Sequence, residues 1–305
     1  MHYLDRALVV AVLCAAAISV ISAAVEDDVY RKTVEKWRQE REDRLKADDG
    51  WLTVAGLHFL NEGENRFGSS PTNDIVLPES APPEVGVFTY RGGKLTARIK
   101  DGVTALQSGK PVRQAEFKVG VQQDALTVGG LTMWMHYSGD RHAIRVRDQN
   151  SPLRKNFTGC KWFPIEEKFR VAGKFAPYAQ PKPVRFPNIL GDYEAYDALG
   201  LVEFTLDGQP YKMEGVGSGP ANARRLFFVF RDLTSGKESY PAARFLYADL
   251  PKPGTTDVVL DFNQAQNPPC AFNPYTTCPL PPEQNRLRVR IPAGEKNYHG
   301  PNETH

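Results

Sequence analysis

The chain has 305 residues, of which 41% are hydrophobic and 24% charged, an ordinary balance for a folded globular protein. This composition excludes a disordered, collagen-like or coiled-coil chain, and the 25 glycines and 24 prolines indicate many turns and short elements. The formal net charge of +2 shows no basic excess, so nucleic acid is not expected as a partner.

The first segment has the layout of a secretory signal peptide. Arg6 precedes an uninterrupted run of small and apolar residues, Ala7–Ala24, which is followed by acidic residues. We expect residues 1–24 to be a cleaved signal peptide and the protein to be secreted or periplasmic. The alternative is an uncleaved N-terminal anchor, because this run is just long enough to span a bilayer. No membrane span is expected after signal cleavage, since no later segment is as apolar.

An amphipathic helix is predicted over residues 28–48. Tyr30, Val34, Trp37 and Leu45 fall on one stripe at helical spacing, and Gly50 follows the helix. The simplest interpretation is a helix packed on a sheet, with partner binding as the alternative.

From Trp51 onward the pattern predicts a mainly β fold. Short segments alternate apolar and polar residues with a period of two, as in Lys94–Lys100, and glycine-containing turns separate them. We expect a β-sandwich over residues 51–138 and a second sandwich or barrel-like unit over residues 139–296. The proline-rich stretch Ala176–Pro187 predicts a linker or an edge crossover, and the polar residues 297–305 predict a disordered tail.

A candidate binding site lies in the segment Asp261–Arg286, where polar side chains surround six prolines. Prolines fix the backbone, so such a loop holds its polar groups in set directions. The segment Phe230–Leu246 supplies further polar groups and is expected to face this loop. The structural alternative is that these side chains only satisfy the loop backbone.

The leading hypothesis is that a pocket between these segments binds a small polar ligand or a glycan. Arg244 and Arg286 would contact an anionic or hydroxyl-rich ligand, and Tyr240 and Tyr275 would supply stacking faces. The ligand-binding candidates are Arg231, Asp232, Tyr240, Arg244, Asn263, Asn267, Tyr275, Asn285 and Arg286.

Two other functions stay open on the sequence. One is a hydrolase that uses Asp261 or Glu295 as general base, with arginine or asparagine donors stabilising developing negative charge. The other is a structural envelope protein without a pocket. No cofactor motif is present, and the scattered histidines give no metal site.

The cysteines fit an exported protein. Cys270 and Cys278 lie close in sequence within the proline-rich segment, and in an oxidising compartment two such residues normally form a disulfide. Cys160 would then be a small buried thiol.

Two stretches resemble known families. The first contains Leu60–Gly68 and Asn73–Leu77 and is similar to the strand order of forkhead-associated (FHA) β-sandwiches, which bind phosphothreonine through loop arginine and serine residues. Ser69 stands where that family has its arginine, and Ala81–Glu84 replaces its Ser-x-x-His. The resemblance therefore implies an FHA-like scaffold without phosphopeptide binding.

The second resemblance rests on three long motifs. Within Glu35–Leu60 the chain reads W-R-x-E-R-x-x-R-L-K-x-x-D-G-W-L-T-V-A-G-L, and Phe230–Leu246 reads F-R-D-L-T-S-G-K-E-S-Y-P-A-A-R-F-L. Leu260–Lys296 contains N-P-P-C-A-F-x-x-Y-x-T-C-P-L-P-P-x-x-N-R-L and ends in A-G-E-K. These motifs resemble a secreted family known only as domain of unknown function 1684, which implies no activity.

Overall fold

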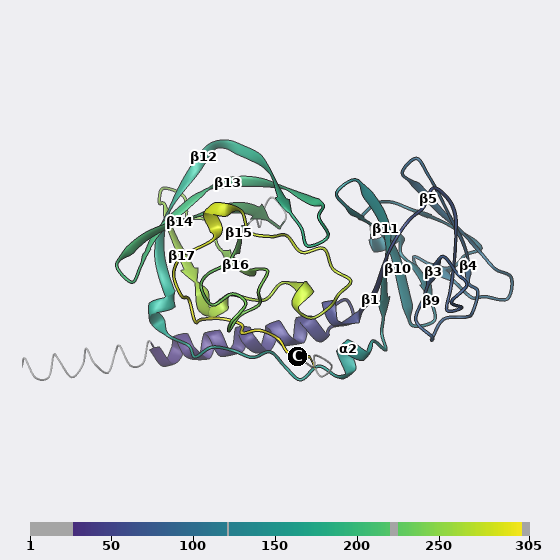
Figure 1. Cartoon of the computed structure of the whole chain (residues 1–305), viewed down its shortest axis with the longest axis horizontal. Helices are drawn as coiled ribbons and strands as arrows, with labels where there is room; N and C mark the ends of the chain where they lie inside the picture. The colour runs from purple at the N-terminus through teal and green to yellow at the C-terminus, as the bar shows by residue number, and fades with distance from the viewer. Residues whose placement is uncertain (1–26, 121, 220–224, 301–305) are drawn as a thin grey trace, which may run out of the picture.

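The computed structural model describes residues 27–120, 122–219 and 225–300. The predicted signal peptide therefore lies outside the described residues. Figure 1 shows a long N-terminal helix, a β-sandwich coloured blue, and a curved sheet coloured green that wraps around the yellow C-terminal segment. The prediction of a mainly β chain with one N-terminal amphipathic helix is confirmed.

The N-terminal helix covers residues 27–46 and packs along the C-terminal body. Val34 and Leu45 on its apolar stripe are fully buried. Arg41 on the same face is also buried, and its Nε donates to Glu295 Oε1 at 2.9 Å. The helix is therefore bound to the C-terminal segment by a buried ion pair as well as by apolar contacts.

The β-sandwich consists of two facing antiparallel-rich sheets with one shared apolar core. Phe67 and Phe88 stack in this core with ring centroids 3.9 Å apart. One sheet has the order β1-β11-β10-β9-β6-β7 and the other β3-β2-β4-β5-β8. The strands are β1 (Val54–Phe59), β2 (Gly63–Gly68), β3 (Ile75–Val76), β4 (Gly86–Arg91), β5 (Lys94–Ile99), β6 (Leu106–Gln107), β7 (Lys110–Pro111), β8 (Gln114–Phe117), β9 (Leu126–Val128), β10 (Leu131–Ser138) and β11 (Arg141–Asp148).

The predicted boundary between residues 138 and 139 falls inside a hairpin. β10 and β11 pair along their whole length, from Leu131 opposite Asp148 to Ser138 opposite Arg141. β11 also pairs with β1, so it is an inner strand of the sandwich. The predicted boundary is therefore a tight connection between two strands of one sheet.

The C-terminal body is one six-stranded sheet with the order β16-β15-β14-β13-β12-β17. The sheet curves so strongly that β16 and β17, at its two edges, contact each other, which gives a half-barrel. Phe204, Phe228 and Phe262 lie in its apolar core. The strands are β12 (Arg170–Pro187), β13 (Tyr193–Leu206), β14 (Gln209–Ser218), β15 (Arg225–Phe230), β16 (Arg244–Ala248) and β17 (Asp257–Asp261).

The proline-rich stretch that predicted a linker or crossover is part of a strand. β12 runs through it and pairs with β13 on both sides of an irregularity between Pro177 and Lys182. A proline can occupy a strand where its missing N–H is not needed for the ladder, and an irregularity supplies such positions.

The remaining elements are single turns, and several of them lie in the C-terminal segment, residues 262–296. That segment joins the sheet through isolated bridges, such as Arg231 opposite Arg286 and Phe245 opposite Gln266. The turns are η1 (Trp51–Thr53), η2 (Gln122–Asp124), α2 (Pro152–Lys155), η3 (Glu167–Phe169), η5 (Phe262–Gln264), η6 (Pro269–Ala271) and η7 (Glu283–Asn285).

The start of the predicted disordered tail is packed onto the body. Tyr298 is 8% exposed, and its ring centroid lies 4.8 Å from that of Phe272. The Asn297 N–H donates to the Glu238 carbonyl at 2.9 Å. Tyr298 is part of an apolar cluster with Phe272, so residues 297–300 belong to the folded part of the chain.

Candidate functional site

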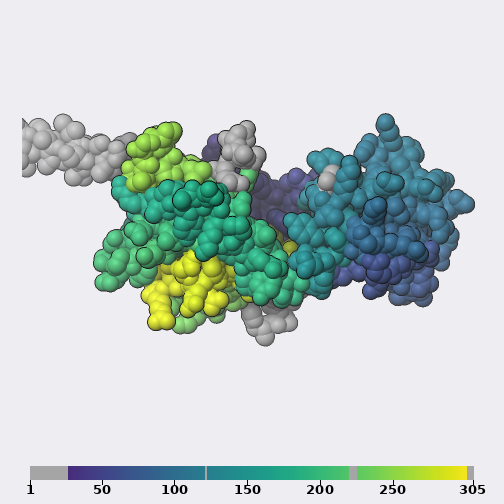
Figure 2. Space-filling view, turned by 90° about the horizontal axis from the view of Figure 1, so that it is seen from above, coloured from purple at the N-terminus to yellow at the C-terminus, as the bar shows by residue number. Residues whose placement is uncertain are grey.

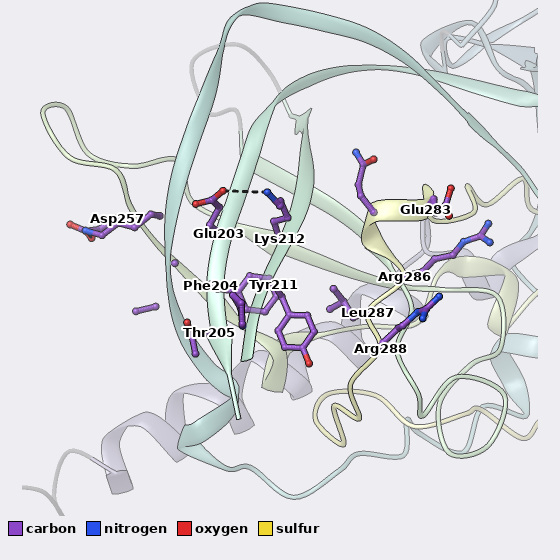
Figure 3. Close-up of a pocket in the computed structure, with 15 residues that line it drawn as sticks. Glu203, Phe204, Thr205, Tyr211, Lys212, Asp257, Glu283, Arg286, Leu287 and Arg288 are labelled. Atoms are coloured by element: carbon purple, nitrogen blue, oxygen red, sulfur yellow. Dashed lines mark hydrogen bonds and ion pairs between the residues drawn. The ribbon is translucent and has the colours of Figure 1, made fainter. Parts of the chain in front are cut away.

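A large cleft lies between the half-barrel and the C-terminal segment and has a volume of about 890 Å³. β13, β14 and the start of β12 form one wall, and residues 283–288 form the other. In Figure 3, Tyr211 and Phe204 on the strands face Leu287 across the opening. The space-filling view in Figure 2 shows the yellow C-terminal segment at the surface beside the green strands.

The floor of the cleft is apolar and aromatic. Phe204 and Tyr211 are opposite each other on β13 and β14, with ring centroids 5.8 Å apart. Leu287 is buried, whereas its neighbours Arg286 and Arg288 are exposed. An extended backbone places alternate side chains on opposite faces, so Leu287 faces the core and both arginines face solvent.

The charged residues on the strand wall are paired with one another. Lys174 Nζ lies 2.5 Å from Asp257 Oδ1, and Lys212 Nζ lies 3.7 Å from Glu203 Oε1. Each pair joins two neighbouring strands. These exposed pairs leave little net charge on this side of the cleft.

The other wall continues into a basic hollow of about 580 Å³, which shares Glu283 and residues 286–288 with the main cleft. Its cations are Arg231, Lys237, Arg286 and Arg288. Among the described residues, none of these four forms an ion pair, and the Arg286 Nε reaches only the Pro281 carbonyl, at 3.4 Å. We call this hollow with the adjoining aromatic floor the two-lobed cleft.

The sequence-predicted candidates Arg231 and Arg286 both line the two-lobed cleft. Their backbones pair in a parallel bridge, which places the end of β15 beside the C-terminal segment. These two residues are therefore the part of the predicted site that the fold brings together.

Arg244 does not line the cleft, and Asp232 lines the basic hollow only as a buried residue, because the two form a buried ion pair. Arg244 is fully buried, its Nη2 lies 3.0 Å from Asp232 Oδ1, and it donates to the carbonyls of Ile291 and Ala293. Asp232 also accepts the Ile291 N–H at 2.6 Å. The pair fastens the C-terminal segment to the start of β16 instead of contacting a ligand.

Asn263 and Asp261 take part in a second internal network. The Asn263 Nδ2 donates to Tyr30 Oη at 2.8 Å and to the Glu166 carbonyl at 2.9 Å. Tyr30 Oη in turn donates to Asp261 Oδ1 at 2.9 Å, and burial raises the pKa of the Asp261 carboxyl. This network ties the N-terminal helix to the end of β17.

Asn267 and Glu295 are buried beside Arg41. Glu295 Oε2 accepts the Asn267 N–H at 2.9 Å, and the Asn267 Nδ2 donates to the Lys296 carbonyl at 2.7 Å. Burial raises the pKa of Glu295, although Arg41 favours its charged form. A fully buried carboxylate with these partners is out of reach of a substrate, so Glu295 is not placed to act as a general base in this structure.

The three other candidates are also apart from the cleft. Asn285 is fully buried and donates to the carbonyls of Glu214 and Val229, both at 3.0 Å. Tyr240 donates to the Cys270 carbonyl at 3.2 Å. Tyr275 is 39% exposed but lines neither lobe of the cleft. The aromatic residues that line the cleft are Phe204 and Tyr211 instead.

Sequence reasoning missed Phe204, Tyr211, Lys237 and Arg288. The first two sit in ordinary alternating strands, where aromatic residues indicate a core. Arg288 was visible as part of the alternating Arg286, Arg288 and Arg290 pattern. This alternation places Arg288 on the same side of an extended backbone as Arg286, and it was the one local signal for the basic hollow.

Cys270 and Cys278 are both free thiols in this structure, so their predicted disulfide stays a prediction. They are nevertheless neighbours, since the Cys270 N–H donates to Cys278 Sγ at 3.1 Å. Within the described ranges no group of three or more His, Cys, Asp or Glu residues is placed to hold a metal ion. Nor does any helix in those ranges have the length and apolarity needed to cross a membrane.

Residues 155–296 match the family model described as Protein of unknown function (DUF1684). The chain contains a DUF1684 domain. The domain begins after the sandwich and includes the whole half-barrel and the C-terminal segment, so the two-lobed cleft lies entirely within it. The motif within Glu35–Leu60, which also resembles that family, lies outside the matched residues.

A solved structure also resembles the chain. It is the solution NMR structure of an uncharacterized protein from Haloarcula marismortui, 30% identical over 47% of this chain and 78% of that chain, with a TM-score of 0.40. No curated protein matches.

Proposed function

We propose that the DUF1684 domain binds a small anionic ligand with a ring-shaped body, and that an acidic sugar is the class that fits best. The observation that carries the proposal is a group of four cations beside an aromatic floor, none of which has an ion-pair partner among the residues that the structure describes: Arg231, Lys237, Arg286 and Arg288.

The charge of the basic lobe favours an anion. Four cations line it against one exposed carboxylate, Glu283, because the second acid, Asp232, is buried and paired with Arg244. Arginine binds carboxylate and phosphate groups through two parallel hydrogen bonds, which adds geometric selectivity to the attraction. Unpaired arginines that reach solvent from one extended segment are suited to such a ligand.

The adjoining lobe favours a ring. Tyr211 presents a partly exposed aromatic face, and Phe204 and Leu287 lie beneath it. Thr205 and Gln284 on the rim offer hydroxyl and amide groups to ligand hydroxyls. A pocket with an apolar floor and a few polar groups is typical of small-molecule sites.

Arginine protection tests where the ligand binds. The protein is treated with phenylglyoxal, with and without D-glucuronate or glucose 6-phosphate, and each modified arginine is identified by mass spectrometry. We expect either acid to protect Arg286 and Arg288, while exposed Arg91 on β4 stays equally reactive. Unchanged reactivity at both cleft arginines would contradict the proposal.

We also propose that the chain is exported. The support is the pattern of residues 1–24, a basic start, an apolar run and small residues before an acidic segment. N-terminal sequencing of protein made in a bacterium is expected to begin at Val25 in the periplasmic or medium fraction. Protein that retains Met1 in the cytosolic fraction would overturn this proposal.

A further inference from the structure

Cys270 and Cys278 form a thiol pair at the junction of the two bodies, away from the two-lobed cleft. Cys278 is 4% exposed and belongs to an apolar cluster on the half-barrel, against which Cys270 also packs. The Cys278 carbonyl accepts the Ile189 N–H at 3.1 Å, and Arg145 on β11 of the sandwich interacts electrostatically with the Cys278 thiol.

The two thiols differ in their surroundings. The neighbouring Cys278 side chain lowers the pKa of the Cys270 thiol, while burial raises the pKa of Cys278 well above its ordinary value. Burial, and to a smaller extent Glu194, oppose the lowering of the Cys270 pKa without reversing it. The thiol with the lower pKa is present as thiolate more often, so Cys270 is the better nucleophile.

Access also distinguishes Cys270. A mainly apolar cavity of about 330 Å³ is lined by Cys270 together with Leu52, Leu153 and Phe272. Cys278 is not among its lining residues. A small molecule that enters this cavity therefore meets Cys270 before Cys278.

We propose that Cys270 and Cys278 are a reactive dithiol that exchanges with small-molecule disulfides, with Cys270 as the attacking thiol and Cys278 as the resolving thiol. This inference does not depend on the proposed anion binding.

The exchange has two balanced steps. The Cys270 thiolate attacks one sulfur of the disulfide R–S–S–R, a Cys270–S–S–R bond forms, and R–S⁻ leaves with the electron pair of the broken bond. Cys278 then loses its proton to the released thiolate, its sulfur attacks the Cys270 sulfur, and the second R–S⁻ leaves. The protein gains a Cys270–Cys278 disulfide, and the substrate takes up two electrons.

The remaining thiol provides an internal control. Cys160 is partly buried, burial raises the pKa of its thiol, and its backbone N–H donates to Glu42. It lies outside the cavity that Cys270 lines. Cys160 should therefore react slowly wherever Cys270 reacts quickly.

The test uses the reduced full chain and its Cys278→Ser and Cys270→Ser variants, with oxidised glutathione as the probe. Mass spectrometry is expected to find a Cys270–Cys278 disulfide in the unaltered protein and a glutathione adduct on Cys270 in Cys278→Ser. In Cys270→Ser, Cys278 should stay unmodified.

A second measurement uses only the unaltered protein, so it remains informative if a variant does not fold. In the unaltered protein, Cys270 should be alkylated by iodoacetamide about tenfold faster than Cys160, as expected for a thiol of lower pKa and better access. Equal rates, or an absent Cys270 adduct in folded Cys278→Ser, would overturn the proposal. A Cys270–Cys278 disulfide that glutathione reduces only after denaturation would also overturn the proposal, since such a disulfide is structural and does not exchange in the folded protein.

Discussion

At the scale of single residues, polar side chains in the C-terminal segment mostly brace the backbone. Asn285 and Asn263 each donate to main-chain carbonyls of other elements, and Arg244 on β16 donates to the Ile291 carbonyl of the segment. A segment without regular strands must satisfy its own and its neighbours' backbone groups through side chains. Proline density and polar content were therefore correct signals of rigidity, but they did not indicate which polar groups would remain free for a ligand.

His136 gives a residue-scale prediction about pH. The Arg145 Nη2 contacts His136 Nε2 at 2.9 Å, and burial, followed by the Arg145 charge, lowers the pKa of His136 to about 3 from its ordinary 6.5. Between these values the unfolded chain binds a proton that the folded protein does not, so stability falls as pH falls through this window.

We expect His136→Gln to lose less stability than the unaltered protein when the pH is lowered from about 7.5 to about 5.5. The difference should approach 1.4 kcal/mol, because pH 5.5 lies one unit below the ordinary pKa of 6.5 and each such unit corresponds to about 1.4 kcal/mol. Urea unfolding at both pH values measures it. Equal losses for both proteins would show that His136 does not titrate differently on folding.

At the scale of elements, local patterns predicted the N-terminal helix and the alternating strands well. The same local rules misread β12, because strand pairing with β13 overrides the propensity of its prolines. They also placed a domain boundary inside the β10–β11 hairpin, because local patterns do not show which strands pair with each other. Whether a segment is a strand or a linker, and where a domain ends, depends here on pairing with strands that local patterns do not identify.

The N-terminal helix gives the element-scale prediction. Arg41→Met should lower the free energy of unfolding by about 3–5 kcal/mol, because it leaves the buried Glu295 carboxylate without its partner. Lys36→Met is the matched control, since its pair with Glu40 is exposed and 3.8 Å long, and it should cost no more than about 0.5 kcal/mol. Chemical denaturation followed by circular dichroism compares them. Equal effects would mean that the ion pair does not hold the helix.

At the scale of the whole molecule, the two bodies share polar contacts as well as the helix. Ser138 Oγ at the end of β10 donates to Asp192 Oδ2 at 2.8 Å and accepts from Asn188 Nδ2 at 3.0 Å. Asn273 in the C-terminal segment donates to the Val54 carbonyl of β1 at 2.6 Å. The DUF1684 domain is thus in contact with residues of the sandwich that precede its matched range.

The site could be predicted only in part from the sequence. Arg231 and Arg286 were named because they stand in distinctive polar segments, whereas Phe204 and Tyr211 became part of the cleft through the curvature of the sheet. The curvature depends on the pairing of all six strands, so it cannot be predicted from a short sequence motif.

The most direct test of the account is a calorimetric titration of the protein with D-glucuronate, glucose 6-phosphate and neutral glucose. We predict that at least one of the two acids binds the unaltered protein and Arg91→Ala alike, and more tightly than glucose. The Arg286→Ala/Arg288→Ala double variant should bind that acid at least about tenfold more weakly, because each lost charge-assisted hydrogen bond costs about 1.5–3 kcal/mol. Equal affinity of the double variant and the unaltered protein, or no binding of either acid, would contradict anion binding in the two-lobed cleft.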